Sequence, residues 1–228
     1  MLYANDIDGN RVHIEDVQQG ESYYCPLCGQ QLILKLGTKK IHHFAHKSLK
    51  DCDTWAEGMS NWHLEWQERL TKSFHSKDLA EVVLEVDGKK HRADFMVNSL
   101  VIEFQHSPIS QTEYDERCEF YTTNNKKLIW VFDYREKYAN KRIMSTKYYN
   151  HKYKKLIKAY KWLYPCQLDY IHENVEVFFQ LTDTLIVRYK CICNRRSKYY
   201  YFKADKFTSD SFVRYMYILA RKEQERAI

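Results

Sequence analysis

The pattern of apolar and polar positions predicts a helix over residues 60–74. The stretch "SNWHLEWQERLTKSF" places large apolar residues one helical turn apart: Trp62, Trp66, Leu70 and Phe74. Ser60 or Asn61 precedes this stripe and is a suitable N-terminal cap.

Three strands, a second helix and a fourth strand are predicted to follow. "AEVVLEV", "KKHRADFMV" and "LVIEFQ" read as strands separated by Asp87-Gly88, a strong hairpin turn, and by the weaker turn Asn98-Ser99. Ser110 and Glu113 form a capping box for a helix that runs to about Thr123. "KLIWVFD" is almost entirely apolar, which predicts a strand covered on both faces.

The register of these strands gathers carboxylates on one face. If Asn98 and Ser99 form a two-residue loop, Asp94 lies opposite Glu103, with Gln105 on the same face as Glu103. The same logic at Asp87-Gly88 brings Glu81 beside Asp94. The other face is apolar: Ala93, Phe95, Val97, Leu100, Ile102 and Phe104.

Adjacent carboxylates repel one another unless a cation joins them. One interpretation is a Mg²⁺ site, in which the ion polarises a phosphate and activates water for attack on phosphorus. The alternative is a solvent-facing acidic surface paired with lysines from elsewhere in the chain.

Composition favours a folded protein with reduced cysteines. The chain has 228 residues and 44% hydrophobic content. We expect no membrane span, because no apolar run approaches the length required, and no signal peptide, because "MLYANDIDGN" lacks its features. The seven cysteines are therefore expected in a reducing, cytoplasmic setting, where paired cysteines favour metal binding over disulfides.

Charge is segregated along the chain. Residues 1–133 have 15 Lys and Arg against 21 Asp and Glu, whereas residues 134–161 have 10 against 1. Basic residues interleaved with tyrosines suit a phosphate backbone and stacked bases, so this basic segment predicts a DNA partner. The alternative is a solvated surface that binds nothing.

The N-terminal part carries a predicted zinc site. Cys25 and Cys28 form a C-x-x-C pair, and a structural zinc ion needs four nitrogen or sulfur ligands. His46 and Cys52 are the favoured second pair, with His43 as the alternative to either. Two buried free cysteines beside surface histidines are the competing interpretation. Cys191 and Cys193 are too few for a site of their own and are interpreted as strand residues.

The last third is predicted to hold three more strands, "NVEVFFQ", "TLIVRYKCIC" and "KYYYFKA". "SDSFVRYMYILARKEQERA" is predicted as a terminal helix, capped by Ser209 or Asp210. No motif is apparent in this region.

The combination "HRADF…VIEFQHSPIS…EYDERCEFY…KLIWVFD", preceded by "CPLC…HHFAH…C" and "WHLEW", resembles the competence protein CoiA family. The resemblance covers roughly residues 1–135. It implies the PD-(D/E)XK nuclease superfamily, with Asp94 and Glu103 as metal ligands and Gln105 at the position of the superfamily's lysine. Arg117 and Tyr121 match the family's R-x-x-x-Y, and His63 matches a histidine of its first helix.

Other polar residues have alternative roles. His63 fits a core histidine as well as a catalytic one, and Arg117 with Tyr121 fits a structural pair as well as a DNA contact. His91 and His106 are expected to flank the site or to face solvent, and Arg92 to contact a phosphate or to balance Glu103. Glu57 and Glu65 are alternatives for an acid contributed by the first helix.

We therefore expect an α/β (α+β) fold with a restriction-endonuclease-like αβββαβ core. The predicted divisions are a zinc module over residues 1–54, the nuclease-like core over 55–135, and a basic segment with an α+β extension over 136–228.

The expected function is a Mg²⁺- or Mn²⁺-dependent deoxyribonuclease acting in DNA uptake, recombination or phage defence. Its catalytic candidates are Asp94, Glu103, Gln105, Glu81 and His63. The alternative is a DNA-binding module with a weak or inactive site, and a purely protein-binding scaffold is a third hypothesis.

Overall fold

The computed structural model describes residues 1–39, 41–48, 52, 60–150, 154–163, 174–196 and 199–226. The chain forms two compact units, Met1–Met96 and Val97–Ile228, and each is described by itself. Within the described ranges, no helix has the length and apolar character required to cross a lipid bilayer.

The first unit begins with two small antiparallel sheets. Their strands and the 3-10 turn between them are β1 (Tyr3–Asn5), β2 (Arg11–His13), η1 (Ile14–Asp16), β3 (Leu32–Lys35) and β4 (His43–His46). The turn at Ile7–Asn10 joins β1 to β2. A compact apolar cluster lies between the sheets: Met1, Ala4, Ile14, Tyr23, Cys25, Leu32 and Phe44. Cys25 therefore belongs both to this core and to the cysteine pair.

The rest of the first unit is a helix followed by a hairpin. Its elements are α1 (Asn61–Ser73), η2 (Lys77–Leu79), β5 (Ala80–Val86) and β6 (Lys89–Val97). Ser60 caps α1 by accepting the N–H of His63. Asp87 and Gly88 both have positive φ, at 49° and 75°, which is the backbone that a tight two-residue hairpin requires.

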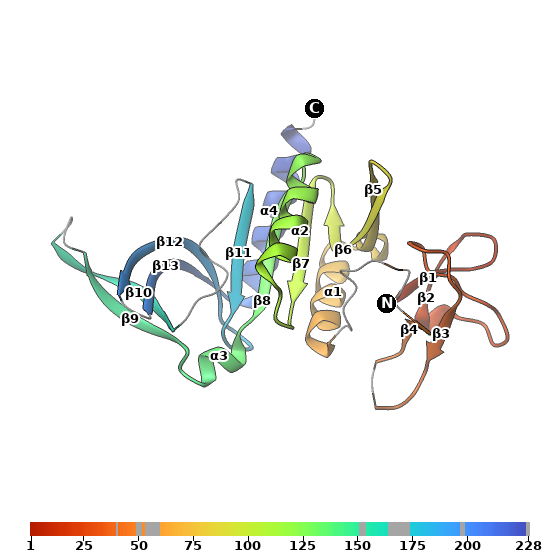
Figure 1. The fold of residues 1–228 in the computed structure, drawn as a ribbon, viewed down its shortest axis with the longest axis horizontal. Helices are drawn as coiled ribbons and strands as arrows, with labels where there is room; N and C mark the ends of the chain where they lie inside the picture. Colours follow the sequence, from red (N-terminus) through yellow and green to blue (C-terminus); the bar gives the residue numbers. More distant parts are fainter. Residues whose placement is uncertain are drawn as a thin grey trace. The chain divides into compact units, whose positions relative to one another are not determined.

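The second unit contains seven strands of a mixed sheet and three helices (Figure 1). In chain order its elements are β7 (Leu100–Gln105), α2 (Gln111–Thr123), β8 (Lys127–Asp133), α3 (Arg135–Ala139), β9 (Ile143–Asn150), β10 (Lys155–Leu163), β11 (Val175–Gln180), β12 (Ile186–Arg196), β13 (Tyr199–Phe207) and α4 (Ser209–Arg226). The strand order is β7-β8-β11-β12-β13-β10-β9. β8 runs parallel to both β7 and β11, and the remaining neighbours pair antiparallel.

Helices α2 and α4 cover opposite faces of this sheet. Trp130 of β8 contacts Tyr114 and Cys118 of α2. Phe178 of β11 points to the other face, where its ring packs against Phe212 of α4. The central strands are therefore buried on both sides, and every residue of β7 is buried.

The predicted order of helix, three strands, helix and strand is confirmed by α1, β5, β6, β7, α2 and β8. The Ser110 cap is also confirmed, because its hydroxyl accepts the N–H of Glu113 at 3.1 Å. The three late strands and the terminal helix are present as β11, β12, β13 and α4. The hairpin of β9 and β10 within the basic segment was not predicted, because its lysines and tyrosines blur the alternation that marks a half-buried strand.

A network of charged groups ties β8, β11, β12 and α4 together around Glu176. The Glu176 carboxylate accepts from Lys127 Nζ at 2.9 Å, from Arg188 Nη1 at 3.2 Å and from the Tyr215 hydroxyl at 3.0 Å. Burial acts to raise the pKa of Glu176, but the contacts with Lys127, Arg188 and Tyr215 outweigh it and hold this pKa below its usual value. The carboxylate therefore stabilises the fold when ionised.

We expect Glu176→Gln to lower the free energy of unfolding at neutral pH by about 1–3 kcal/mol, because two partly buried cations lose their counter-charge. Because the folded-state pKa is depressed, this contribution is present at neutral pH and is lost as pH falls through that pKa. Denaturant unfolding followed by circular dichroism at neutral and acidic pH measures both effects. Glu225→Gln, an exposed change in α4, is the control. An equal loss at both pH values would contradict the role of the ionised carboxylate.

Candidate functional site

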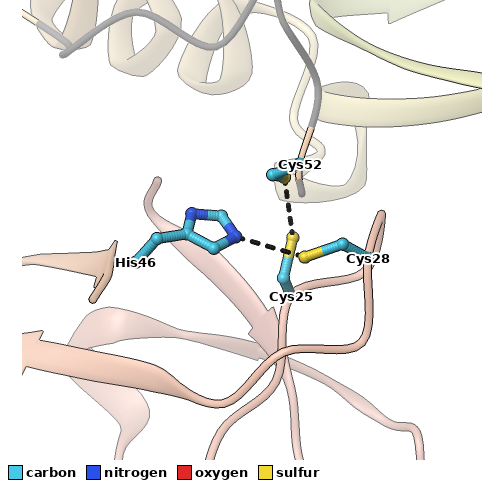
Figure 2. A group of neighbouring side chains, drawn as sticks. All are labelled: Cys25, Cys28, His46 and Cys52. Carbon is cyan, nitrogen blue, oxygen red and sulfur yellow. Dashed lines mark hydrogen bonds between the residues drawn. The ribbon is translucent and has the colours of Figure 1, made fainter. Parts of the chain in front are cut away.

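Three cysteines and one histidine converge in the first unit (Figure 2). One ligand atom from each of Cys25, Cys28, His46 and Cys52 lies within 4.8 Å of all the others. The Cys25 and Cys52 sulfurs are 3.8 Å apart, and Cys28 Sγ lies 3.4 Å from His46 Nε2. A tetrahedral zinc ion with bonds of about 2.3 Å to sulfur places two sulfurs about 3.8 Å apart. The spacing therefore fits one metal ion.

Local structure explains how the C-x-x-C pair reaches this point. Tyr24 bridges both Asn5 and Gln31, which fixes the backbone just before Cys25. The N–H of Gly29 donates to the Cys25 carbonyl at 2.9 Å and closes the turn. Gly29 has a φ of 71°, a conformation that glycine adopts without a steric penalty. The two sulfurs are thus brought together by the turn itself.

The position of each histidine on strand β4 shows which of them belongs to the cysteine cluster. His46 ends the strand and joins the cluster, whereas His43 lies on the opposite face of the strand and its Nδ1 is 2.8 Å from the Ile41 carbonyl oxygen. Burial raises the pKa of Cys25 and lowers that of His46. The neutral imidazole is the form that binds metal, and each thiol would release a proton on binding. The donor set suits zinc.

The predicted catalytic residue Asp94 lies in β6 of the first unit. His63 of α1 approaches it, with Nε2 at 3.0 Å from Asp94 Oδ1. Gln67, one turn further along α1, donates to the Asp94 carbonyl at 2.9 Å. The helix therefore holds both the side chain and the backbone of Asp94. Gln67 was missed from the sequence, although its position four residues after His63 places both on one helical face.

Glu81 has a different set of partners. Its carboxylate accepts the N–H of Leu2 at 2.8 Å and that of Tyr3 at 3.3 Å, and it is only 2% exposed. Its φ is 50°, in the left-handed region, between the paired positions Ala80 and Val82 of β5. Such a backbone costs on the order of 1–3 kcal/mol in a residue other than glycine. The contacts with β1 hold this carboxylate in place.

In the second unit, Glu103 is the buried carboxylate at the centre of the candidate site. It is 2% exposed. The Tyr121 hydroxyl donates to its Oε1 at 2.7 Å, and Arg117 Nη1 lies 3.5 Å from its Oε2. Arg117 also pairs with Glu113. The R-x-x-x-Y residues of α2 thus hold the carboxylate of β7, and the interpretation as a solvent-facing acidic surface does not apply to Glu103.

Beyond Glu103, the end of β7 carries Gln105 and His106. The Gln105 amide donates to the Ser107 carbonyl at 2.9 Å, which fixes this buried side chain. His106 Nδ1 is 2.9 Å from Asp133 Oδ2, and Arg135 forms two contacts with the same carboxylate. The Arg135 and His106 contacts overcome the effect of burial and lower the pKa of Asp133. Asp133 was missed because nothing in the sequence marks the end of β8 as part of this group.

The remaining predicted residues are spread over the two units. Asp94 belongs to the first unit and Glu103 to the second, and their direct pairing stays a prediction. In β6, His91 lies opposite Leu84 and Arg92 opposite Val83 of β5. Glu65 is exposed on α1, and Glu57 lies outside the described residues. Cys191 and Cys193 lie in strand β12, as predicted.

Comparison with known proteins gives two family matches. The family model described as "Competence protein CoiA, N-terminal domain" matches residues 8–54, and that of "Competence protein CoiA, nuclease-like domain" matches residues 60–212. The competence protein CoiA of Bacillus subtilis (strain 168) is 28% identical over an alignment of 134 residues, and the match covers 54% of this chain and 35% of that protein. The match thus spans about a third of the relative's length, and no solved structure gives a significant match.

The metal cluster leads to a direct prediction. We expect the purified protein to contain about one zinc ion per chain, and His46→Ala or Cys28→Ser to lose it, because each removes one of four ligands. The matched control, His43→Ala, should keep the metal. Elemental analysis of each purified variant measures the stoichiometry, and thermal unfolding measures the accompanying loss of stability. Zinc retained by His46→Ala but lost by His43→Ala would contradict the assignment.

Glu81 can be tested as an anchor. We expect Glu81→Ala to lower the free energy of unfolding by about 1–3 kcal/mol, because the buried N–H of Tyr3 and the partly buried N–H of Leu2 lose their acceptor. Glu81→Gln, which keeps an acceptor oxygen, should lose less, and the exposed Glu85→Ala of the same strand should lose little. Denaturant unfolding measures all three. If Glu81→Gln leaves stability unchanged but abolishes metal-dependent cleavage, Glu81 is a metal ligand instead.

Proposed function

This chain belongs to the competence protein CoiA family, and from that membership we propose that it is a nuclease that hydrolyses phosphodiester bonds of DNA with the help of Mg²⁺ or Mn²⁺. The observation that carries the proposal is the buried Glu103 carboxylate, oriented by Tyr121 and Arg117, two residues before the buried Gln105. A carboxylate is not buried in a strand whose every residue is buried without a cost. A catalytic role explains why the sequence retains it.

We propose Asp94 and Glu103 as the ligands of the catalytic metal. The fit is favourable on chemical grounds, because carboxylate oxygens are the donors that hard divalent cations prefer. Each carboxylate oxygen has two acceptor positions, so the contacts of Glu103 with Tyr121 and Arg117 leave capacity for a cation. When bound, such a cation would polarise the phosphate and lower the pKa of a bound water.

The surrounding residues would position these groups. His63 holds the Asp94 carboxylate at 3.0 Å and can carry a proton at Nε2. Tyr121 and Arg117 fix the rotamer of Glu103. Gln105, held on Ser107, would orient the attacking water through its amide, although a neutral amide supplies no charge to the transition state. Glu81 is already held by the amides of Leu2 and Tyr3, so we propose that it supports the site by fixing β5.

The remaining parts of the proposal concern DNA and zinc. The basic segment, residues 134–161, would follow the phosphate backbone. The Cys25, Cys28, His46 and Cys52 cluster would hold a structural zinc ion. By analogy with the name of its Bacillus subtilis relative, the process would be competence, which makes DNA uptake or recombination the setting to examine first; phage defence is the other setting.

A second candidate function is a DNA-binding module with a weak or inactive nuclease site. Gln105 favours it, because lysine at this position would offset charge that develops on the phosphate and glutamine does not. Binding without cleavage would distinguish this function from the first.

We expect cleavage of single- or double-stranded DNA in Mg²⁺ or Mn²⁺ and none in EDTA. Asp94→Asn and Glu103→Ala should each lower the rate by more than about a hundredfold. Tyr121→Phe should lower it by about 10–100-fold, the range typical of a residue that orients a metal ligand. Gel assays of labelled DNA measure the rates, and thermal unfolding confirms that each variant is folded. DNA binding with no cleavage under any metal condition would establish the second candidate.

A further inference from the structure

The hairpin of β9 and β10 concentrates positive charge in one element. From residue 137 to residue 168 the sequence has nine lysine and arginine residues and no aspartate or glutamate. The strands β9 and β10 lie within this stretch and pair over eight positions, from Ile143 with Trp162 to Asn150 with Lys155. The outer part of the hairpin therefore has no acidic residue of its own to balance its lysines.

The register places two lysines directly opposite each other. Lys147 pairs with Lys158, and the next pair on the same face is Tyr149 with Leu156. Both lysines are exposed, and Tyr149 and Leu156 are 44% and 62% exposed. Directly opposite side chains in an antiparallel pair have Cβ atoms about 4.5–5.5 Å apart, and like charges at this distance repel. An anion between the two ammonium groups would remove that repulsion.

This face of the hairpin continues into the face of the sheet that carries Glu103. Lys158 and Tyr160 point to the same side of β10, and the Tyr160 ring stacks on Phe202 of β13. Phe202 contacts Phe179 of β11, and Phe179 contacts Phe132 of β8. Phe132 is paired with Gln105 of β7, two residues beyond Glu103. The lysine pair and Glu103 are thus on one face of the sheet.

We propose that the face formed by Lys147, Tyr149, Leu156 and Lys158 binds single-stranded nucleic acid. Phosphates would lie between Lys147 and Lys158, and a base would stack on Tyr149 with Leu156 beside it. A duplex has no exposed base face to offer to a tyrosine on a strand, whereas unpaired bases do, and aromatic groups beside lysines are the usual platform for them. This inference rests on the proposed nuclease function, because it names single strands as the form of DNA that would reach the sheet face carrying Glu103.

The test measures binding without cleavage. In EDTA and at low salt, the fluorescence anisotropy of labelled oligothymidylate reports affinity for single strands, and a labelled duplex of equal length is the comparison. We expect Lys147→Ala/Lys158→Ala to weaken single-strand binding at least tenfold. Its slope of log affinity against log salt should fall by about 1.4, because each phosphate contact on a single strand contributes about 0.7. Tyr149→Ala should weaken binding by about 5–150-fold, the range found for one stacked base, and Tyr149→Phe should restore most of it.

The matched control removes the same charge from the other face of the sheet. Lys203→Ala/Lys222→Ala changes a β13 lysine whose position alternates with Phe202 and an exposed lysine of α4, the helix that covers that other face. We expect this variant to keep most of its affinity. Equal losses of single-strand affinity in both double variants would overturn the inference. So would a labelled duplex that binds more tightly than the single strand and loses as much affinity in Tyr149→Ala. Binding of an acidic peptide or of anionic lipid vesicles in preference to the oligonucleotide would also overturn it.

Failure of this inference can be told apart from failure of the nuclease proposal. Glu225→Gln, the exposed control in α4, should bind oligothymidylate like the wild type, because Glu225 is not part of the hairpin face. If the hairpin variants lose binding but the wild type never cleaves DNA, the binding face stands and the nuclease proposal fails. If the wild type cleaves DNA and the hairpin variants bind and cleave normally, the nuclease proposal stands and the binding face is wrong.

Discussion

A carboxylate on a fully buried strand is the constraint around which the second unit is organised. Glu103 lies on β7 among residues that are buried on both faces, so its charge requires partners within the protein. Tyr121 and Arg117 of α2 supply them. Their spacing of four residues brings both onto one side of the helix, and this fixes the rotation of α2 on the sheet. The apolar contact of Tyr114 with Trp130 then completes the same interface.

The N-terminal part of the first unit is too small for a large apolar core and needs another source of stability. The cluster around Phe44 and Tyr23 is apolar, but it reaches directly to Cys25. A metal held by Cys25, Cys28, His46 and Cys52 would join the turn, strand β4 and the chain beyond it at a single point. In small modules, metal binding commonly supplies the folding free energy that a limited core does not.

Local chemistry made much of this structure predictable. Asp87-Gly88 and the Ser110 cap depend on residues a few positions apart, and the C-x-x-C pair with His46 and Cys52 depends on ligand types that few other structures need. The features that were missed depend on distant residues. Glu81 has a left-handed backbone and accepts the amides of Leu2 and Tyr3, and Asp133 is joined to the end of β7 by His106, 27 positions before it. The sequence around Glu81 or Asp133 does not indicate these distant partners.

The parallel pairing of β8 with β11 has a consequence for how the chain folds. Leu128 is paired with Val175, and the whole β9–β10 hairpin lies between them in the sequence. During synthesis, β7 can pair with β8 well before β11 exists, so one edge of an almost entirely apolar strand stays open while the hairpin emerges from the ribosome. Contacts between such distant residues form slowly, and an open apolar edge invites pairing with other chains. The lysine-rich hairpin that appears during this interval carries like charge on every nascent copy, which would keep those copies apart until β11 closes the sheet.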